Sequence, residues 1–348
     1  MRASRAIPTL ILAALLFASL SRAAAAQSAS AIFEQGIKAF KSRDFIAAEQ
    51  AFAELAQRDP SAASFNDLAM AEAAAGNLNR AIQDFQKSIQ LGNHSAAIRY
   101  NLGLAYLRSH QPRAGIEELR KSLATNPKYQ PAQYALGVAL LDSGRAQEAS
   151  AYLDGLRKEF PRDPRVWANL AEAQFAAGQS KQAVETAQNA VEEIPNNARL
   201  AVTLATICID YRQIQTARTL LENANELMPE DVEVRLLLAK ASLLAGEPVE
   251  TLAVLKPMPS GAAHPGERLL LMGEARALTG NFGPASVDLA AAMKQSPDNP
   301  RYLSAYAWLE QFLGKYNDAI QTLAKARALD PKSPFIPYRI GVSHYFLT

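Results

Sequence analysis

One column of small residues recurs along almost the whole chain, and it constrains the fold more than any other feature. Glycine or alanine stands at ten positions, each 34 residues from the next except for a first step of 33. The column consists of Gly36, Ala69, Gly103, Gly137, Ala171, Ala205, Ala239, Gly273, Ala307 and Gly341. This period indicates an array of stacked repeats rather than the two or three globular domains that 348 residues would otherwise suggest.

A second small column follows the first by twelve residues and defines a helix pair within each repeat. It consists of Ala48, Ala81, Gly115, Ala149, Ala183, Ala217, Thr251, Ala285 and Ala319. Two antiparallel helices can approach closely only where their side chains are small. We therefore expect the two columns to meet across each hairpin, with Gly137 facing Ala149. The apolar set one residue before the first column, such as Leu102 and Leu136, supports a helical core face.

Glycine and proline punctuate the repeat at fixed places. Glycines stand between the two expected helices of six repeats, where a left-handed backbone ends a helix: Gly76, Gly144, Gly178, Gly246, Gly280 and Gly314. Prolines follow the second helix and prevent its continuation: Pro60, Pro127, Pro161, Pro195, Pro229, Pro297 and Pro331. The pattern therefore predicts helix, turn, helix and stop within each period.

The complete pattern resembles the tetratricopeptide repeat. One copy carries the signature at Trp167, Leu170, Ala171, Gly178, Ala183 and Pro195. The resemblance implies an all-α, right-handed superhelical solenoid of antiparallel helix hairpins, with about nine 34-residue repeats and a terminal half-repeat. It also implies a concave groove, lined by the first helix of each repeat, that binds an extended peptide or a partner helix.

The repeat register divides the chain into five parts. We expect a signal peptide at 1–26, repeats one to six at 29–231, a degenerate seventh repeat at 232–265, repeats eight and nine at 266–333, and a terminal helix at 334–348. The segment Leu255–Glu267 packs three prolines and two glycines into 13 residues, so the second helix of the seventh repeat should end early. Two interpretations stay open for this segment: a degenerate repeat without a role, and a hinge or docking loop.

The first 26 residues have the layout of a secretory leader. Arg2 and Arg5 precede an apolar run from Ile7 to Leu20, and Ala24 to Ala26 offer small residues for cleavage before Gln27. The run is shorter than the roughly 20 residues that span a bilayer. We therefore expect a secreted protein, periplasmic if the source is bacterial, with no stable membrane insertion after the leader is removed.

Charge argues against nucleic acid as a partner. The leader contains three arginines and no acid, so the remaining chain carries 33 basic and 34 acidic side chains. A surface so close to neutral has no electrostatic reason to bind nucleic acid or an anionic membrane.

Neither a catalytic nor a metal site is predicted. The four histidines, His94, His110, His264 and His344, lie in different repeats, and three of them fall in expected turns or loops. The lone Cys208 lies in an alanine-rich helical run and is expected to be a buried, inert thiol. We therefore expect a protein that is not an enzyme and has no cofactor.

The repeat register predicts which side chains line the groove. The expected ligand-binding residues are Tyr100, Asn101, Leu104, Tyr134, Val138, Arg165, Asn169, Glu172, Trp308 and Phe312. An apolar strip with a few hydrogen-bonding groups suits an extended peptide or an amphipathic helix. Packing between neighbouring helices is the competing interpretation for the tyrosines.

Two functions remain open at this stage. The first is an interaction scaffold that binds a peptide or partner protein in envelope assembly, secretion or polysaccharide export. The alternative is the recognition arm or accessory subunit of an enzyme whose catalytic domain lies elsewhere. The apolar end Tyr345-Phe346-Leu347-Thr348 has three interpretations: a truncated gene, a contact for self-association, and a docking surface.

Overall fold

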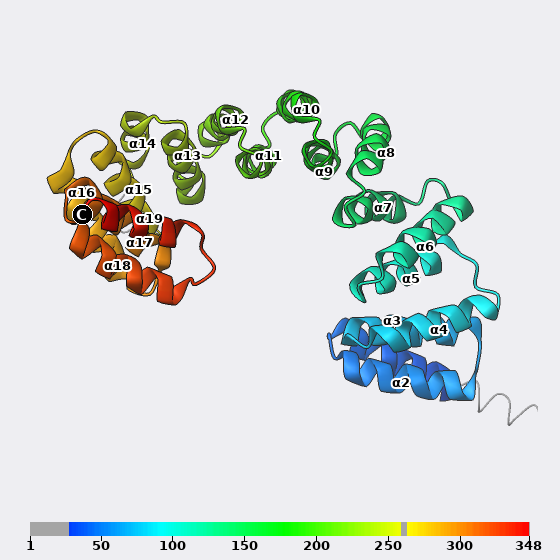
Figure 1. The fold of residues 1–348 in the computed structure, drawn as a ribbon. Helices are drawn as coiled ribbons and strands as arrows, with labels where there is room; N and C mark the ends of the chain where they lie inside the picture. The colour runs from blue at the N-terminus through cyan, green and yellow to red at the C-terminus, as the bar shows by residue number, and fades with distance from the viewer. Residues whose placement is uncertain (1–27, 259–262, 348) are drawn as a thin grey trace, which may run out of the picture. The chain divides into compact units, whose positions relative to one another are not determined.

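The computed structural model describes residues 28–258 and 263–347, and the expected leader at 1–26 lies outside the described residues. Within this part of the chain all regular secondary structure is helical, which confirms the all-α class. A helix at 28–41 is followed by Phe45–Arg58 (α2), Ala62–Ala75 (α3), Leu78–Gln90 (α4), Ala96–Arg108 (α5), Pro112–Thr125 (α6), Gln130–Asp142 (α7), Ala146–Glu159 (α8), Pro164–Ala176 (α9), Ser180–Glu193 (α10), Ala198–Asp210 (α11), Ile214–Leu227 (α12), Val232–Leu244 (α13), Pro248–Leu255 (α14), Pro265–Leu278 (α15), Phe282–Gln295 (α16), Pro300–Phe312 (α17), Tyr316–Leu329 (α18) and Phe335–Tyr345 (α19) (Figure 1).

The helices form two units, the first ending at Leu156 and the second starting at Arg157. Within each unit, the two helices of one repeat pack against each other as a hairpin. Examples are α3 with α4 and α5 with α6 in the first unit, and α15 with α16 and α17 with α18 in the second (Figure 1). We call the first helix of each repeat helix A and the second helix B.

The two small columns are buried where helices A and B cross. Nine members of the first column, from Gly36 to Ala307, are buried, and so are all nine members of the second. Gly341 in α19 is the exception, because a methyl group added there would meet no atom within 4 Å. The columns therefore mark the crossings that the sequence predicted.

The side chain nearest to the buried glycines of the first column is a large residue of helix B, and the sequence pattern did not identify this contact. A Cβ on Gly137 would lie 2.6 Å from Leu153 Cδ2, so the expected pairing of Gly137 with Ala149 is corrected to Leu153. The small columns do approach each other elsewhere, since a Cβ on Gly103 would lie 3.1 Å from the carbonyl oxygen of Gly115. The residue 16 positions after each small residue forms a third buried column: Phe52, Phe85, Leu119, Leu153, Ala187, Leu221, Leu255, Leu289 and Leu323.

The turn between helices A and B has the same backbone conformation in every repeat. All six predicted turn glycines have positive φ, between 72° and 90°. Three repeats place another residue at the equivalent position, namely Arg43, His110 and Arg212, with φ of 60° to 63°. The left-handed conformation is thus imposed by the hairpin and does not depend on glycine.

The seventh repeat is shortened as the prolines predicted. Helix α14 has 8 residues, whereas its neighbours have 13 or 14. Met258 follows it, is almost fully buried, and packs with Leu236, Leu255 and Leu271. The larger side chain of Met258 occupies the register position of Ala292 in the next repeat, so it fills space near the lost helical turn.

Candidate protein-interaction surface

The predicted groove residues of the first unit lie on two neighbouring A helices. Tyr100, Asn101 and Leu104 are on α5, Tyr134 and Val138 are on α7, and all five are half-buried. The ring of Tyr100 meets the ring of Tyr129 edge-on, with centroids 5.7 Å apart and planes at 81°. Burial raises the pKa of Tyr100, with a smaller contribution from Tyr129. Tyr100 is therefore partly engaged in packing.

The predicted residues on α9 belong to the second unit. Arg165 is exposed and bonds the carboxylate of Asp163 through Nε at 3.0 Å and Nη2 at 2.6 Å. Asp163 is also the N-cap of α9, and its bonds to Arg165 hold its pKa below the ordinary value. Arg165 thus completes the start of the helix, while Asn169 and Glu172 lie half-buried one and two turns further along.

A row of exposed apolar side chains runs across the last four A helices of the second unit. It comprises Leu244, Leu278, Phe312 and Phe346, which are 51%, 51%, 62% and 58% exposed, and we call it the apolar row. The four residues are spaced 34 positions apart. Leu244, Leu278 and Phe312 are the last residues of α13, α15 and α17, and Phe346 directly follows α19. Helix α13 contacts α15, and α15 contacts α17. Exposed apolar side chains in register form one surface rather than scattered positions.

Further aromatic rings pack against two members of the apolar row. Phe282, at the start of α16, packs on Phe312 with ring centroids 5.4 Å apart. Tyr316, at the start of α18, stacks on Phe346 at 5.2 Å with planes at 11°. Trp308 lies one helical turn before Phe312 and contacts its ring at 5.9 Å. These contacts restrict the orientations of the Phe312 and Phe346 rings.

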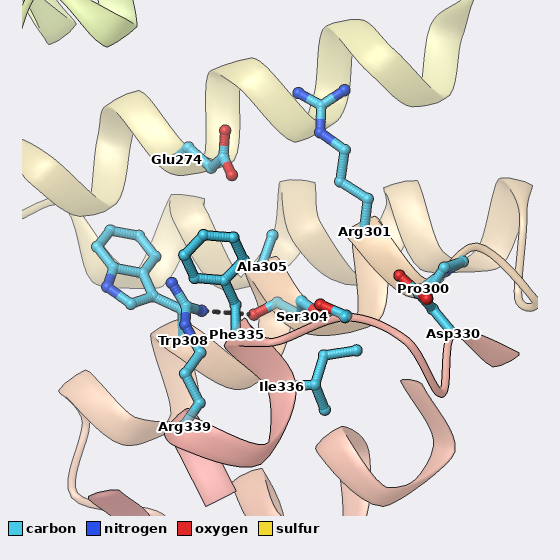
Figure 2. Close-up of a pocket in the computed structure, with 11 residues that line it drawn as sticks. Glu274, Pro300, Arg301, Ser304, Ala305, Trp308, Asp330, Phe335, Ile336 and Arg339 are labelled. Atoms are coloured by element: carbon cyan, nitrogen blue, oxygen red, sulfur yellow. Dashed lines mark hydrogen bonds between the residues drawn. The ribbon is translucent and has the colours of Figure 1, made fainter. Parts of the chain in front are cut away.

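A pocket of about 360 Å³ adjoins the apolar row, and we call it the terminal pocket. Helices α15, α17 and α19 and the segment before α19 supply its lining: Glu274, Pro300, Arg301, Ser304, Ala305, Trp308, Asp330, Ser333, Phe335, Ile336 and Arg339. Figure 2 shows Glu274 above the rings of Trp308 and Phe335, with Arg339 beside the indole. Trp308 belongs to the pocket and touches the row, so the two features form one continuous surface.

The charged groups of the terminal pocket differ in their partners. Arg301 donates from Nη1 to both carboxylate oxygens of Glu267, at 2.8 and 2.9 Å. Arg339 donates to the carbonyl oxygen of Ser304 at 3.0 Å, and burial lowers its pKa. Burial raises the pKa of Glu274 despite the opposing effects of Arg301 and Arg339. Glu274 is thus a carboxyl group that has lost much of its water.

The described residues offer no constellation for metal binding, since they contain no group of three histidine, cysteine or acidic side chains placed to hold an ion. His94, His110 and His264 lie in turns or loops, as predicted. Cys208 is fully buried, and burial raises its pKa to about 12, which suppresses the reactive thiolate. No helix of the described part is long and apolar enough to cross a membrane.

Only part of this surface was predicted from the sequence. Trp308 and Phe312 were predicted, and the structure brings them together with Phe282 and the terminal pocket. Leu244, Leu278 and Phe346 were missed, although stepping by 34 from Phe312 finds all three. Phe335 and Arg339 lie in the terminal half-repeat, where fewer register columns guide the assignment.

Family models described as tetratricopeptide repeat match residues 33–96, 106–173 and 140–207, so these parts of the chain carry tetratricopeptide repeats. The C-terminal part of a repeat-containing protein from Cytophaga hutchinsonii aligns with a TM-score of 0.53 at 14% identity, covering 78% of this chain and 98% of that one. A tetratricopeptide repeat protein from Parabacteroides merdae aligns with a TM-score of 0.46 at 13% identity, covering 81% and 99%. The first of these similarities supports the repeat fold alone.

The MamA protein shares 24% identity over 48% of this chain and 92% of its own, with a TM-score of 0.45. A comparison with curated proteins gave no match.

Proposed function

We propose that this tetratricopeptide-repeat chain is an exported interaction scaffold, and that it holds a partner protein along the apolar row and the terminal pocket of its second unit. Tetratricopeptide repeats typically form such scaffolds, and their stacked helices present extended binding surfaces. The observation that carries the proposal is the row of four apolar side chains, each more than half exposed, on successive A helices.

The first unit lacks this row at the same register. Helix α5 ends on Arg108 and α7 on Asp142, where α15 and α17 end on Leu278 and Phe312. All four helices occupy the same place in their hairpins, so the fold does not require an apolar residue at this position. The apolar row is therefore a property of one region. An exposed apolar patch confined to one region is characteristic of a binding surface.

The dimensions of the row suit a helix or an extended segment of a partner. Packed helices lie about 8–10 Å apart, so four successive A helices span roughly 30 Å. In a partner helix, residues i and i+7 lie about as far apart as two neighbouring A helices, since each residue rises 1.5 Å. Phe312 and the adjoining Trp308 are then the anchors, because large aromatic side chains carry most of the energy of such interfaces.

The leader-like segment at 1–26 supports export as part of the proposal. Its basic start, apolar run and alanine-rich end suit removal by a signal peptidase. N-terminal sequencing of the protein purified from its source should find a chain that starts near Gln27. A chain that retains Met1 and stays with the membrane would contradict export without affecting the binding surface.

Site-specific photocrosslinking tests the binding surface. A benzophenone amino acid at position 312 in the native compartment should give a discrete crosslinked product. Val287 on α16 is the matched control, because it is apolar, 69% exposed and outside the row and the pocket. Equal products from positions 312 and 287, or none from position 312, would contradict the proposal.

A further inference from the structure

The terminal pocket contains a half-buried acidic group, Glu274, to which no donor of the described residues bonds. Glu274 accepts no hydrogen bond and forms no ion pair within the described residues, although it is half-buried. A carboxyl group removed from water costs free energy unless a donor replaces the lost hydrogen bonds. The pocket is therefore incomplete at Glu274, and a donor from a ligand would complete it.

The charge balance around Glu274 favours a cation. The lining contains two acidic side chains, Glu274 and Asp330, and two basic ones, Arg301 and Arg339, but Arg301 is paired with Glu267, which lies outside the lining. Glu267 already neutralises Arg301 through its two oxygens. One monovalent cation therefore balances the pocket.

Two aromatic rings make the space below Glu274 suitable for the same kind of group. Trp308 and Phe335 both line the pocket, and Figure 2 shows their rings on the side toward Glu274. The face of an aromatic ring attracts ammonium and guanidinium groups, most strongly for tryptophan. The aliphatic stem of a lysine or arginine also packs well on such rings.

We propose that the terminal pocket binds one lysine or arginine side chain of the partner, with its cationic end at Glu274 and its stem against the rings of Trp308 and Phe335. This inference rests on the proposed function, because it assigns the partner to the same surface. The apolar row then binds the neighbouring apolar residues of the partner, and the pocket selects those segments that carry a basic residue beside them.

A titration with short peptides tests the chemistry of the pocket. The probes are acetylated, amidated pentapeptides of alanine with lysine, arginine, norleucine or glutamate at the centre. The readout is the indole N–H resonance of Trp308, and the second tryptophan, Trp167, is an internal reference because it is buried and donates to Pro161. We expect saturable shifts at Trp308 with the lysine and arginine peptides, and binding at least tenfold weaker with norleucine and glutamate.

Two variants complete the test. Glu274→Gln keeps the shape of the side chain and removes its charge, and it should weaken lysine-peptide binding about tenfold. Glu226→Gln removes the same charge from an exposed site on α12 outside the pocket and should change binding less than twofold. Preference for the glutamate peptide, no shift with any peptide, or equal binding by both variants would overturn the proposal.

Free n-butylammonium separates a side-chain site from a site for small amines. It should bind at least tenfold more weakly than the lysine peptide, and equal affinity would overturn the assignment to a partner side chain. The failures of the two proposals are distinguishable. A crosslink at position 312 without peptide binding rejects only the pocket chemistry, whereas the absence of that crosslink rejects the scaffold surface.

Discussion

The hairpin α3–α4 in the first unit and the hairpin α15–α16 in the second have the same architecture and different chemistry at their crossing. In α3–α4 the cross-hairpin pair consists of the buried Glu72 and the half-buried Asp84. In α15–α16 the equivalent residues, 204 positions later, are Arg276 and Asp288. One hairpin thus places two acids where the other places an ion pair.

The acidic pair of α3–α4 favours a proton. No N–H or O–H group of the described residues donates to Glu72 Oε2, and the carboxyl group of Asp84 raises the pKa of Glu72, so the surroundings favour a proton on this pair. Burial, followed by the charge of Asp84, raises the pKa of Glu72 to about 8. Burial also raises the pKa of Asp84. Arg80 approaches Glu72 at 3.6 Å but bonds Glu49 more closely, at 2.6 Å.

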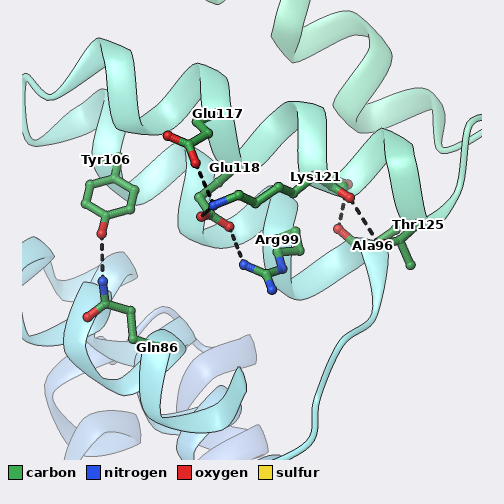
Figure 3. A network of polar contacts seen from close by, with 9 residues as sticks. Gln86, Ala96, Arg99, Tyr106, Glu117, Glu118, Lys121 and Thr125 are labelled. Carbon is green, nitrogen blue, oxygen red and sulfur yellow. Dashed lines mark hydrogen bonds and ion pairs between the residues drawn. The ribbon is translucent and has the colours of Figure 1, made fainter. Parts of the chain in front are cut away.

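The hairpin α15–α16 offsets its acid with a cation. Arg276 Nη1 lies 2.5 Å from Asp288 Oδ2. Repeat three uses a further solution, in which Glu118 bonds Arg99 at 2.8 Å and Lys121 at 2.9 Å, and Tyr106 accepts from Gln86 (Figure 3). The comparison teaches that the small and large columns are common to the hairpins, while the polar pair across them differs from repeat to repeat.

Breaking the ion pair of α15–α16 should have the largest effect. Arg276→Met leaves Asp288 buried without its main cation, and we expect a loss of about 2–3 kcal/mol in the free energy of unfolding, somewhat below a fully buried pair because Arg276 is partly exposed. Urea unfolding measures the loss, with Arg199→Met on α11 as an exposed control. Equal stability of the two variants would show that the pair does not hold the hairpin.

The acidic pair should make repeat two less stable as pH rises. The carboxyl group of Glu72 titrates near 4.5 in the unfolded chain and near 8 in the folded one. Between these values the folded chain retains a proton that the unfolded chain has released, so the free energy of unfolding falls with increasing pH. Glu72→Gln supplies a donor at every pH and should stabilise the repeat by about 1–2 kcal/mol at pH 9.

Hydrogen exchange of the α3 and α4 amides, measured at pH values normalised for intrinsic exchange, locates the effect in this hairpin. Glu34→Gln is the control, because Glu34 is exposed on the helix at 28–41, outside this hairpin. A Glu72→Gln variant that keeps the full pH dependence of the wild type would contradict the shared proton.

Gly273 of α15 should not tolerate the alanine that α3 has at the same register. Gly273 corresponds to Ala69 in α3, yet a Cβ on Gly273 would lie 2.6 Å from Leu289 Cγ. Gly273→Ala should therefore cost about 1–2 kcal/mol. Gly341→Ala, at the same register in open space, should be neutral or stabilising by up to about 1 kcal/mol, because alanine favours helix. Thermal unfolding of both variants checks the sign, and a stabilising Gly273→Ala would invalidate the third column.

The turns should give the smallest effect. Gly76 and Gly280 have positive φ in the two compared hairpins, and His110 has φ of 60° at the same position of repeat three. His110→Gly should stabilise the chain by about 0.5–1 kcal/mol, and Gly280→His should destabilise it by a similar amount. Stability changes of the same sign in both variants would contradict an intrinsic cost of the left-handed turn.

The sequence predicted the elements whose physical cause is local or strictly periodic. Turn glycines, the two small columns and the early end of α14 all follow from backbone conformation or from the closeness of two helices, so single residues reveal them. The third column was harder to recognise. Leu153 contacts Gly137 from the other helix of the hairpin, and the apolar character of Leu153 does not indicate which residue it contacts.

The candidate surface was only partly predictable for a different reason. Periodicity identifies buried positions by their constancy, whereas the apolar row differs from repeat to repeat: Arg108 and Asp142 stand where Leu278 and Phe312 stand later. The terminal pocket depends on the approach of Arg339 and Phe335 in α19 to Glu274 in α15, which are more than 60 residues apart in sequence. Such a meeting follows from the stacking of three A helices and has no signature in any one of them.

The most direct test of the central claim is the affinity of the partner crosslinked at position 312 for a chain whose row has the first unit's character. In that chain Leu278→Asp and Phe312→Arg introduce the residues found at Asp142 and Arg108. We predict at least a hundredfold loss of affinity with helicity unchanged, because the anchor Phe312 is removed and charged side chains replace two members of the apolar row. Full affinity in a folded double variant would contradict the claim that the apolar row is the binding surface.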